Sequence, residues 1–298
     1  MRVGVVGATG FVGKALVAAL TERGDVVVAF SRDPARARKT LARVADARSL
    51  EAITAEGVAD LDAVVNLAGE SIGAKRWDAE YKAAILDSRV STTHRVVDAI
   101  GAAGRRPQVL INASAVGFYG PRGDEEVTEA TPSGDDFLSG VCREWEREAE
   151  RVSSFGAREV RMRLGVVLGD GGGSLEKMLL PFKMFVGGPV GDGRQWFSWV
   201  HLADVVGAIV WALDHPTLHG AVNVTAPEPV RFRDFAEALG RRLRRPSWLP
   251  VPAFALRLAM GQMAEVVVTG QRAVPAALIA DGYSFKYSRI DDALTTVV

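Results

Sequence analysis

Three glycines close to the start of the chain have the spacing of a phosphate-binding turn. Gly7, Gly10 and Gly13 follow a valine-rich run over residues 3–6 and precede an apolar helical pattern that continues to Leu20. After a strand, the first glycine permits a tight turn, the second lets the backbone approach a pyrophosphate, and the third lets the helix pack closely. The N-terminus of that helix presents free N–H groups and a positive dipole end to the phosphates. The stretch therefore predicts a dinucleotide site, whose remaining contacts we assign to Thr9, Phe11 and Val12.

The end of the second predicted strand, Val26–Phe30, selects the cofactor. A carboxylate there would accept a hydrogen bond from the ribose 2′-OH of NAD and would repel a 2′-phosphate. Ser31 and Arg32 stand there instead, and a guanidinium fork suits a phosphate dianion. The sequence therefore favours NADP(H) over NAD(H), although Asp33 could also bind a ribose hydroxyl.

Two further strand ends complete the predicted cofactor site. A turn of small residues, 66–69, follows the apolar strand that starts at Leu61, and such a turn leaves room for a ribose. Another apolar strand is predicted over residues 160–169. The cofactor contacts expected from these strands are Asn66, Leu67, Ala68, Gly69, Arg163 and Leu164.

Several charged side chains keep two interpretations. Asp46, after a short strand predicted over residues 42–45, either accepts a hydrogen bond from the adenine amino group or caps the helix that begins near Ser49. Lys82 and Arg89, on an amphipathic segment, either point to the cofactor or lie in solvent, and the second is the commoner fate of helix charges.

Aromatic residues gather after a glycine-rich loop over residues 186–193. Trp196, Phe197 and Trp199 follow the loop, with Arg194 beside them. Such a cluster could stack on a base or a sugar while the guanidinium holds a phosphate. We assign substrate binding to Glu70, Arg194 and Trp196, and expect Phe197 in the core.

Composition narrows the class of protein. The 298 residues include 36 basic and 36 acidic ones, and the resulting zero formal charge argues against a nucleic-acid groove or a membrane-surface protein. The single cysteine, Cys142, excludes an internal disulfide and a cysteine-based zinc site, and we expect no metal. The chain shows no leader sequence and no apolar stretch long enough to span a bilayer. We expect a cytoplasmic protein whose partner is a small-molecule substrate, with neither nucleic acid nor membrane; its oligomeric state cannot be read from the sequence.

The order of the predicted elements indicates an α/β fold with a Rossmann-type doubly wound parallel sheet. Residues 1–169 are expected to form the NADP-binding domain, which about 199–226 complete. Residues 170–198 and 227–298 are expected to form a small C-terminal substrate domain.

Several motifs resemble those of the extended short-chain dehydrogenase/reductase superfamily, which contains the NAD-dependent epimerase/dehydratase enzymes. These motifs are residues 7–13, 66–69, 114–120 and 199–204. More specific segments look like the atypical YfcH-like branch, which carries a C-terminal domain of unknown function, DUF1731; they are residues 134–138, 141–146, 193–199 and 270–275. The resemblance covers essentially the whole chain and implies the Rossmann fold and a nicotinamide cofactor, NADP(H).

The chain departs from the superfamily at the catalytic pair. In the superfamily a Tyr-x-x-x-Lys pair moves the proton while nicotinamide moves the hydride, and an upstream serine holds the substrate oxygen. Ser114 matches the serine, but the expected window, residues 136–143, contains neither Tyr nor Lys. Tyr119, at the end of the same strand as Ser114, and His201, whose free pKa lies near neutrality, are the candidate substitutes. Their alternatives are a packing role for Tyr119 and a capping role for His201 near the helix at Asp204.

The sequence thus predicts an NADP(H)-dependent oxidoreductase or epimerase with a non-standard catalytic site, acting on a nucleotide-sugar-like substrate. The alternative is a catalytically silent NADPH-binding regulator or sensor. An intact aromatic pocket beside the nicotinamide would favour the enzyme, and a blocked pocket would favour the regulator.

Overall fold

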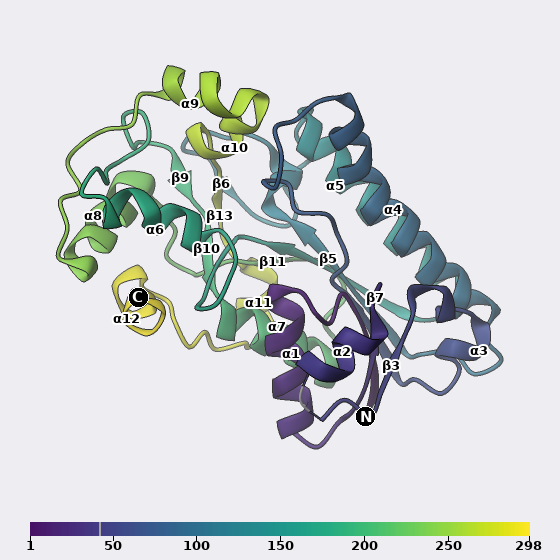
Figure 1. Cartoon of the computed structure of the whole chain (residues 1–298). Helices are drawn as coiled ribbons and strands as arrows, with labels where there is room; N and C mark the ends of the chain where they lie inside the picture. Colours follow the sequence, from purple (N-terminus) through teal and green to yellow (C-terminus); the bar gives the residue numbers. More distant parts are fainter. Residues whose placement is uncertain (42) are drawn as a thin grey trace.

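The computed structural model describes residues 1–41 and 43–298, and this part of the chain is built on a seven-stranded parallel sheet (Figure 1). The strand order is β11-β7-β5-β4-β1-β2-β3, with every neighbouring pair parallel. The strands are β1 (Arg2–Val6), β2 (Val26–Phe30), β3 (Asp46–Arg48), β4 (Ala63–Asn66), β5 (Val109–Ala115), β7 (Arg158–Leu164) and β11 (Gly220–Val224). The order reverses between β1 and β4, the point at which open sheets of this kind bind ligands.

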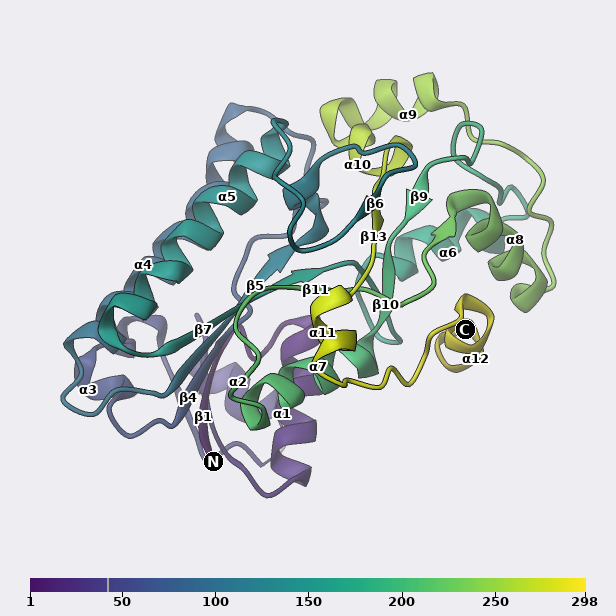
Figure 2. The same cartoon turned by 180° about the vertical axis from the view of Figure 1, so that it is seen from behind.

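Helices cover both faces of the sheet (Figures 1 and 2). One face packs against α1 (Phe11–Glu22), α2 (Pro34–Thr40), α7 (Leu202–Asp214) and α11 (Ala276–Ala280). The other face packs against α3 (Ala55–Val58) and α4 (Ala79–Ala102), and α5 (Phe137–Glu150) lies beside α4. Val3 and Val5 pack into the core on the face covered by α1, and Val6 packs into the core on the face covered by α4. The two faces alternate because successive side chains of a strand point to opposite sides of the sheet. The predicted doubly wound α/β fold is confirmed.

A separate core lies beyond the carboxyl ends of the strands. Its helices are α6 (Leu175–Lys183), α8 (Phe232–Leu243), α9 (Ala253–Met260), α10 (Glu265–Val268) and α12 (Ile290–Val297). Three two-stranded sheets lie outside the main sheet, namely β8 (Val166–Leu168) with β10 (Trp199–His201), β9 (Trp196–Phe197) with β12 (Val230–Arg231), and β6 (Glu126–Val127) with β13 (Arg272–Ala273). The 3₁₀ helices are η1 (Leu50–Ala52), η2 (Val116–Tyr119), η3 (Arg151–Phe155) and η4 (Gly261–Ala264). Residues 170–198 and 227–298 remain the predicted bounds of the small domain, although α11 packs against the core of the main sheet.

The structure corrects three predicted elements. The third strand comprises Asp46–Arg48 and not residues 42–45, of which residue 42 lies outside the described part of the chain. The strand predicted over 160–169 is divided at Gly165 into β7, in the main sheet, and β8, which pairs with β10. The amphipathic segment that contains Lys82 and Arg89 is the first part of one long helix, α4, and not a separate element.

The helices give no sign of a bilayer-spanning segment. Among those in the described ranges, none combines enough length with enough apolar character to cross a membrane.

Candidate functional site

The glycine turn between β1 and α1 has the predicted geometry. Gly7 has a φ of +80°, a conformation that glycine adopts readily and other residues rarely. A Cβ on Gly13 would lie 2.3 Å from the Gly7 carbonyl oxygen, so only glycine lets α1 pack this closely on the turn. Gly10 is the N-cap of α1, and no side chain in the described residues caps that end. The first turn of α1 therefore has N–H groups available for a pyrophosphate.

A cavity of about 1130 Å³ opens beside this turn, at the carboxyl ends of β4, β5 and β7. Its wall includes seven residues predicted for the site, namely Phe11, Leu67, Ala68, Gly69, Ser114, Leu164 and Trp196. Lys82 and Arg89 also line it, which resolves their two interpretations in favour of the cavity. The cavity is large enough for a ligand of substantial size. It is bounded by the main sheet and by the separate core beyond the carboxyl ends of the strands.

Arg32 and Glu70 lie together at the tips of β2 and β4. The Arg32 side chain is 86% exposed, and its Nη1 is 4.0 Å from Glu70 Oε2. Ser31 is buried and its hydroxyl bonds the Asp33 backbone, while the Asp33 carboxylate caps α2 by accepting from the N–H of Arg36. Asp33 is therefore engaged in capping, and Arg32 presents its guanidinium to solvent beside the turn. Glu70, which was predicted to bind substrate, lies beside Arg32 and not in the cavity wall.

Asn66 holds the turn over residues 66–69 in place through hydrogen bonds. Its side chain is fully buried, and its amide nitrogen donates to Asn112 Oδ1 at 2.7 Å and to Thr93 Oγ1 at 2.9 Å. Its Oδ1 accepts from the backbone N–H of Ala68 at 3.2 Å. These bonds fix the backbone of the 66–69 turn, so Asn66 orients the turn from inside the sheet and does not line the cavity.

Asp46 does not cap the helix that follows it, and its contact with adenine stays a prediction. Its carboxylate pairs with Arg48 at 2.8 Å and with Arg38 at 3.5 Å, and the pKa of Asp46 is lowered chiefly by its hydrogen bond to Arg48. The residue thus belongs to an ion-pair group on the outer edge of the sheet.

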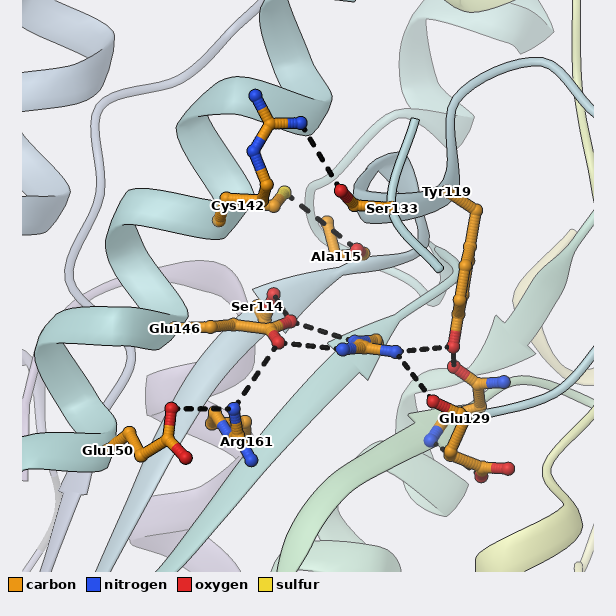
Figure 3. Close-up of polar contacts among 12 residues, drawn as sticks. Ser114, Ala115, Tyr119, Glu129, Ser133, Cys142, Glu146, Glu150 and Arg161 are labelled. Carbon is orange, nitrogen blue, oxygen red and sulfur yellow. Dashed lines mark hydrogen bonds and ion pairs between the residues drawn. The ribbon is translucent and has the colours of Figure 1, made fainter. Parts of the chain in front are cut away.

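Ser114 lines the cavity and bonds a buried carboxylate (Figure 3). Its hydroxyl donates to Glu146 Oε1 at 2.6 Å. Arg163 holds the same carboxylate through two parallel bonds, from Nε to Oε1 and from Nη2 to Oε2, both of 2.8 Å. Glu146 and Arg163 are 2% and 4% exposed, so the pair orients the serine from within the core. Arg163, predicted to contact the cofactor, is a partner of this carboxylate and does not line the cavity.

Glu146 was not predicted as a site residue, although its position in α5 could have indicated that it is buried and paired. The helix has a buried apolar stripe that includes Val141, Cys142, Trp145 and Ala149, and Glu146 lies within that stripe. A carboxylate at a buried helical position is rare without a cationic partner, so its spacing could have indicated a buried pair.

Tyr119 lies in the core and not at the cavity. Its side chain is fully buried, its hydroxyl donates to Asn223 Oδ1 at 2.7 Å, and Arg163 Nη1 donates to it at 2.8 Å (Figure 3). Burial raises the pKa of Tyr119 to about 12. This placement argues against Tyr119 as the proton carrier and agrees with its alternative packing role.

His201 caps α7. Its Nδ1 accepts from the backbone N–H of Ala203 at 3.0 Å, and its Nε2 is 3.0 Å from Thr296 Oγ1. Burial, with a contribution from the charge of Lys286, lowers the pKa of His201 to about 4. Because both ring nitrogens are engaged and the residue does not line the cavity, the structure argues against His201 as an acid or base.

The window in which the superfamily has its Tyr and Lys forms the start of α5. Asp136 caps the helix by accepting from the N–H of Ser139, and Leu138 contributes to the cavity wall. Cys142 lies one turn further on, with its Sγ 3.8 Å from the Ala115 carbonyl oxygen, and burial raises the pKa of its thiol to about 12. The helix therefore offers apolar or inert groups where the superfamily has its proton-transfer pair.

On the opposite side of the cavity Trp196 is held in place by polar neighbours. Its Nε1 donates to Asp124 at 3.0 Å, and the guanidinium of Arg231 lies 3.9 Å from the centre of its ring. Arg194 is exposed and lies outside the cavity wall, so the structure does not place this guanidinium with Trp196 in the cavity. Phe197 belongs to the separate core beyond the carboxyl ends of the strands, so it lies in a core as expected, and it also borders the cavity.

The fold and the glycine turn define a class of protein that binds a dinucleotide at the reversal point of a doubly wound sheet. The chain belongs to the NAD dependent epimerase/dehydratase family, which matches residues 3–225. Residues 251–297 match a domain of unknown function, DUF1731. Both findings confirm the resemblance stated from the motifs.

Individual relatives match over the full length of the chain. A chloroplastic homolog of epimerase family protein SDR39U1 from Arabidopsis thaliana is 42% identical, with 100% of this chain and 87% of the relative covered. Epimerase family protein YfhF from Bacillus subtilis is 38% identical over 100% of this chain and 98% of its own. Among solved structures, human SDR39U1 (isoform 2) with NADPH superposes with a TM-score of 0.91 at 34% identity, covering 100% of this chain and 99% of that one.

Proposed function

We propose that the chain is an NADP(H)-dependent oxidoreductase or epimerase that works without the usual Tyr-Lys pair. The observation that carries this proposal is a cavity of about 1130 Å³ whose wall includes both Phe11, at the start of α1, and Ser114. The alternative, a silent NADPH-binding regulator, is less well supported because this pocket is open and lined by aromatic residues. Cytoplasmic localisation and a nucleotide-sugar-like substrate stay predictions.

The residues around the turn fit an NADP(H) molecule. The glycine turn and the uncapped start of α1 would hold the pyrophosphate, and the exposed guanidinium of Arg32 would meet a 2′-phosphate. Leu67–Gly69 and Leu164 would border the remainder of the molecule at the carboxyl ends of their strands. The NADPH bound in the human SDR39U1 structure supports the same assignment.

Ser114 is placed to handle a proton at the cavity. Its own proton is donated to Glu146, which leaves its oxygen lone pairs free to accept from a substrate hydroxyl. As a substrate hydroxyl gives its proton to Ser114, the serine proton can pass to Glu146; reduction of a carbonyl uses the reverse transfers. Nicotinamide bound in the cavity would accept or donate the accompanying hydride.

Titration of the purified protein with NADPH and with NADH, followed by fluorescence of the reduced nicotinamide, tests the cofactor assignment. We expect tighter binding of NADPH, and we expect Arg32→Asp to weaken NADPH at least tenfold while leaving NADH nearly unchanged. Arg147→Asp is the matched control, since Arg147 is an equally exposed arginine (83%) on α5, away from the turn. Equal losses of NADPH and NADH affinity in Arg32→Asp would refute the role of Arg32.

Measurements of turnover distinguish the proposed enzyme from a catalytically silent NADPH-binding regulator. NADPH oxidation is measured with a panel of carbonyl compounds, and epimerisation with a panel of nucleotide sugars. Activity that Ser114→Ala abolishes without a loss of NADPH affinity supports the enzyme, and tight NADPH binding without turnover across both panels supports the regulator.

A further inference from the structure

Two lysines from different parts of the molecule line one side of the cavity. Lys82 comes from α4, and its Nζ donates to Gln262 Oε1 in η4. Lys177 comes from α6, and its Nζ donates to the Gly73 carbonyl oxygen at 2.7 Å. A Cβ on Gly73 would lie 3.6 Å from Lys177 Nζ and 3.6 Å from Met263 Cε, next to Gln262. Both ammonium groups therefore border the same stretch of wall.

The charges of these two lysines are not compensated by the protein. Within the described part of the chain, neither ammonium group has a carboxylate within 4.0 Å. The two carboxylates in the wall are engaged elsewhere: Asp136 caps α5, and Glu265 pairs with Arg257 at 2.8 Å. Lys82 is partly buried and Lys177 is exposed, and both ammonium groups donate only to neutral oxygens, so both have charge available for an anion.

The wall around the lysines is mainly apolar. It includes Trp77, Phe137, Met178, Met263, Val266 and Val267. Methionine side chains are flexible and adapt to apolar ligands of varied shape.

Three polar side chains of this compartment are bonded within the protein. The Gln195 amide nitrogen donates to the carbonyl oxygens of Val190 and Val267, and that of Gln271 donates to Val116. The Ser198 hydroxyl donates to the Gln271 carbonyl oxygen at 2.6 Å.

We propose that the substrate of this cavity is a compound with an apolar body and one anionic group, and that Lys82 and Lys177 hold the anionic group while the apolar wall holds the body. The proposal rests on the proposed function, because the same cavity receives the cofactor beside Ser114. A carboxylate and a phosphate monoester share the required chemistry; a nucleotide sugar, which is anionic but lacks the apolar body, is the rival substrate that the test includes.

Isothermal titration calorimetry of the full chain saturated with NADP⁺ tests the proposal with octanoate, octyl phosphate, 1-octanol and UDP-glucose. We expect at least one of the two anions to bind ten or more times more tightly than 1-octanol and than UDP-glucose. The ratio of octanoate to octyl phosphate affinity then identifies which anionic group the lysines prefer.

Lys82→Gln and Lys177→Gln are expected to remove most of the preference for the anion over 1-octanol while leaving 1-octanol binding unchanged. Lys183→Gln is the matched control, because Lys183 is an exposed lysine on the same helix as Lys177 but does not line the cavity. Equal affinities for the anions and 1-octanol, no binding of either anion, tighter binding of UDP-glucose, or an unchanged preference in both lysine variants would each overturn the proposal.

The first titration, of NADP⁺ alone, separates this test from that of the proposed function. If NADP⁺ does not bind, the proposed function fails, and the probes are titrated into the cofactor-free protein to judge the lysines by themselves. If NADP⁺ binds and the anions do not, only the substrate class is wrong.

Discussion

Glu146 and Arg163 form an ion pair whose side chains are almost completely removed from water. Each is held by further bonds, Glu146 by the Ser114 hydroxyl and Arg163 by the Tyr119 hydroxyl and the Glu129 carbonyl oxygen. Such a pair contributes little net stability compared with apolar residues, but removal of one partner leaves a buried charge. The pair therefore ties the geometry of Ser114 to the integrity of the core.

Replacing Glu146 by glutamine leaves the Arg163 guanidinium buried without a counter-charge. We expect Glu146→Gln to lower the free energy of unfolding by about 3–5 kcal/mol, measured by urea denaturation. Glu144→Gln is the control on the same helix, where the side chain is exposed, and we expect a change within about 0.5 kcal/mol. Similar stabilities for the two variants would show that Arg163 finds another partner.

At the scale of elements, α7 depends on a neutral histidine as its N-cap. Folding lowers the pKa of His201 from 6.5 to about 4, because burial disfavours the imidazolium and Lys286 adds to this effect. Below pH 6.5 the unfolded chain binds a proton that the folded chain does not, so the folded state loses stability as the pH falls from about 6.5 to 4. The loss is at most about 3.5 kcal/mol at about 1.4 kcal/mol per pKa unit.

The variant His201→Asn isolates this contribution, since asparagine is also a favoured N-cap residue and does not titrate in this range. We expect the difference in unfolding free energy between pH 7.5 and pH 5 to be smaller in His201→Asn than in the wild type. His219→Asn, at an exposed histidine, is the control and should keep the wild-type pH dependence. An unchanged slope in His201→Asn would show that other groups govern the acid sensitivity.

The elements differ in how far local sequence determines them. The glycine turn was predictable because its function depends on spacing within seven residues next to a strand. For Tyr119 and His201 the sequence left two roles open each, because their partners Asn223 and Thr296 lie 104 and 95 residues away in the chain. Arg163 was assigned to the cofactor for the same reason, since no local pattern shows that its side chain turns into the core toward Glu146.

At the scale of the whole molecule, cofactor binding is coupled to folding. A ligand that binds only the folded state adds about 2.7 kcal/mol of stability at a concentration 100 times its Kd. We expect NADPH at that concentration to raise the melting temperature of the wild type, and the same concentration to have a much smaller effect on Arg32→Asp. Differential scanning fluorimetry provides the measurement, and an equal rise in both proteins would contradict the assigned role of Arg32.

The wall of the cavity is formed by segments that the ribosome synthesises at very different times. The glycine turn comes from residues 7–13, whereas Gln262, Met263 and Gln271 belong to a much later stretch of the chain. That stretch is held by β13, which pairs with β6 outside the main sheet, and by Glu129, whose carboxylate accepts from the N–H groups of Asn223 in β11 and of Ala277. During synthesis on the ribosome, the nucleotide-binding half can therefore form early, while the compartment beside it can be enclosed only after residue 277 has emerged.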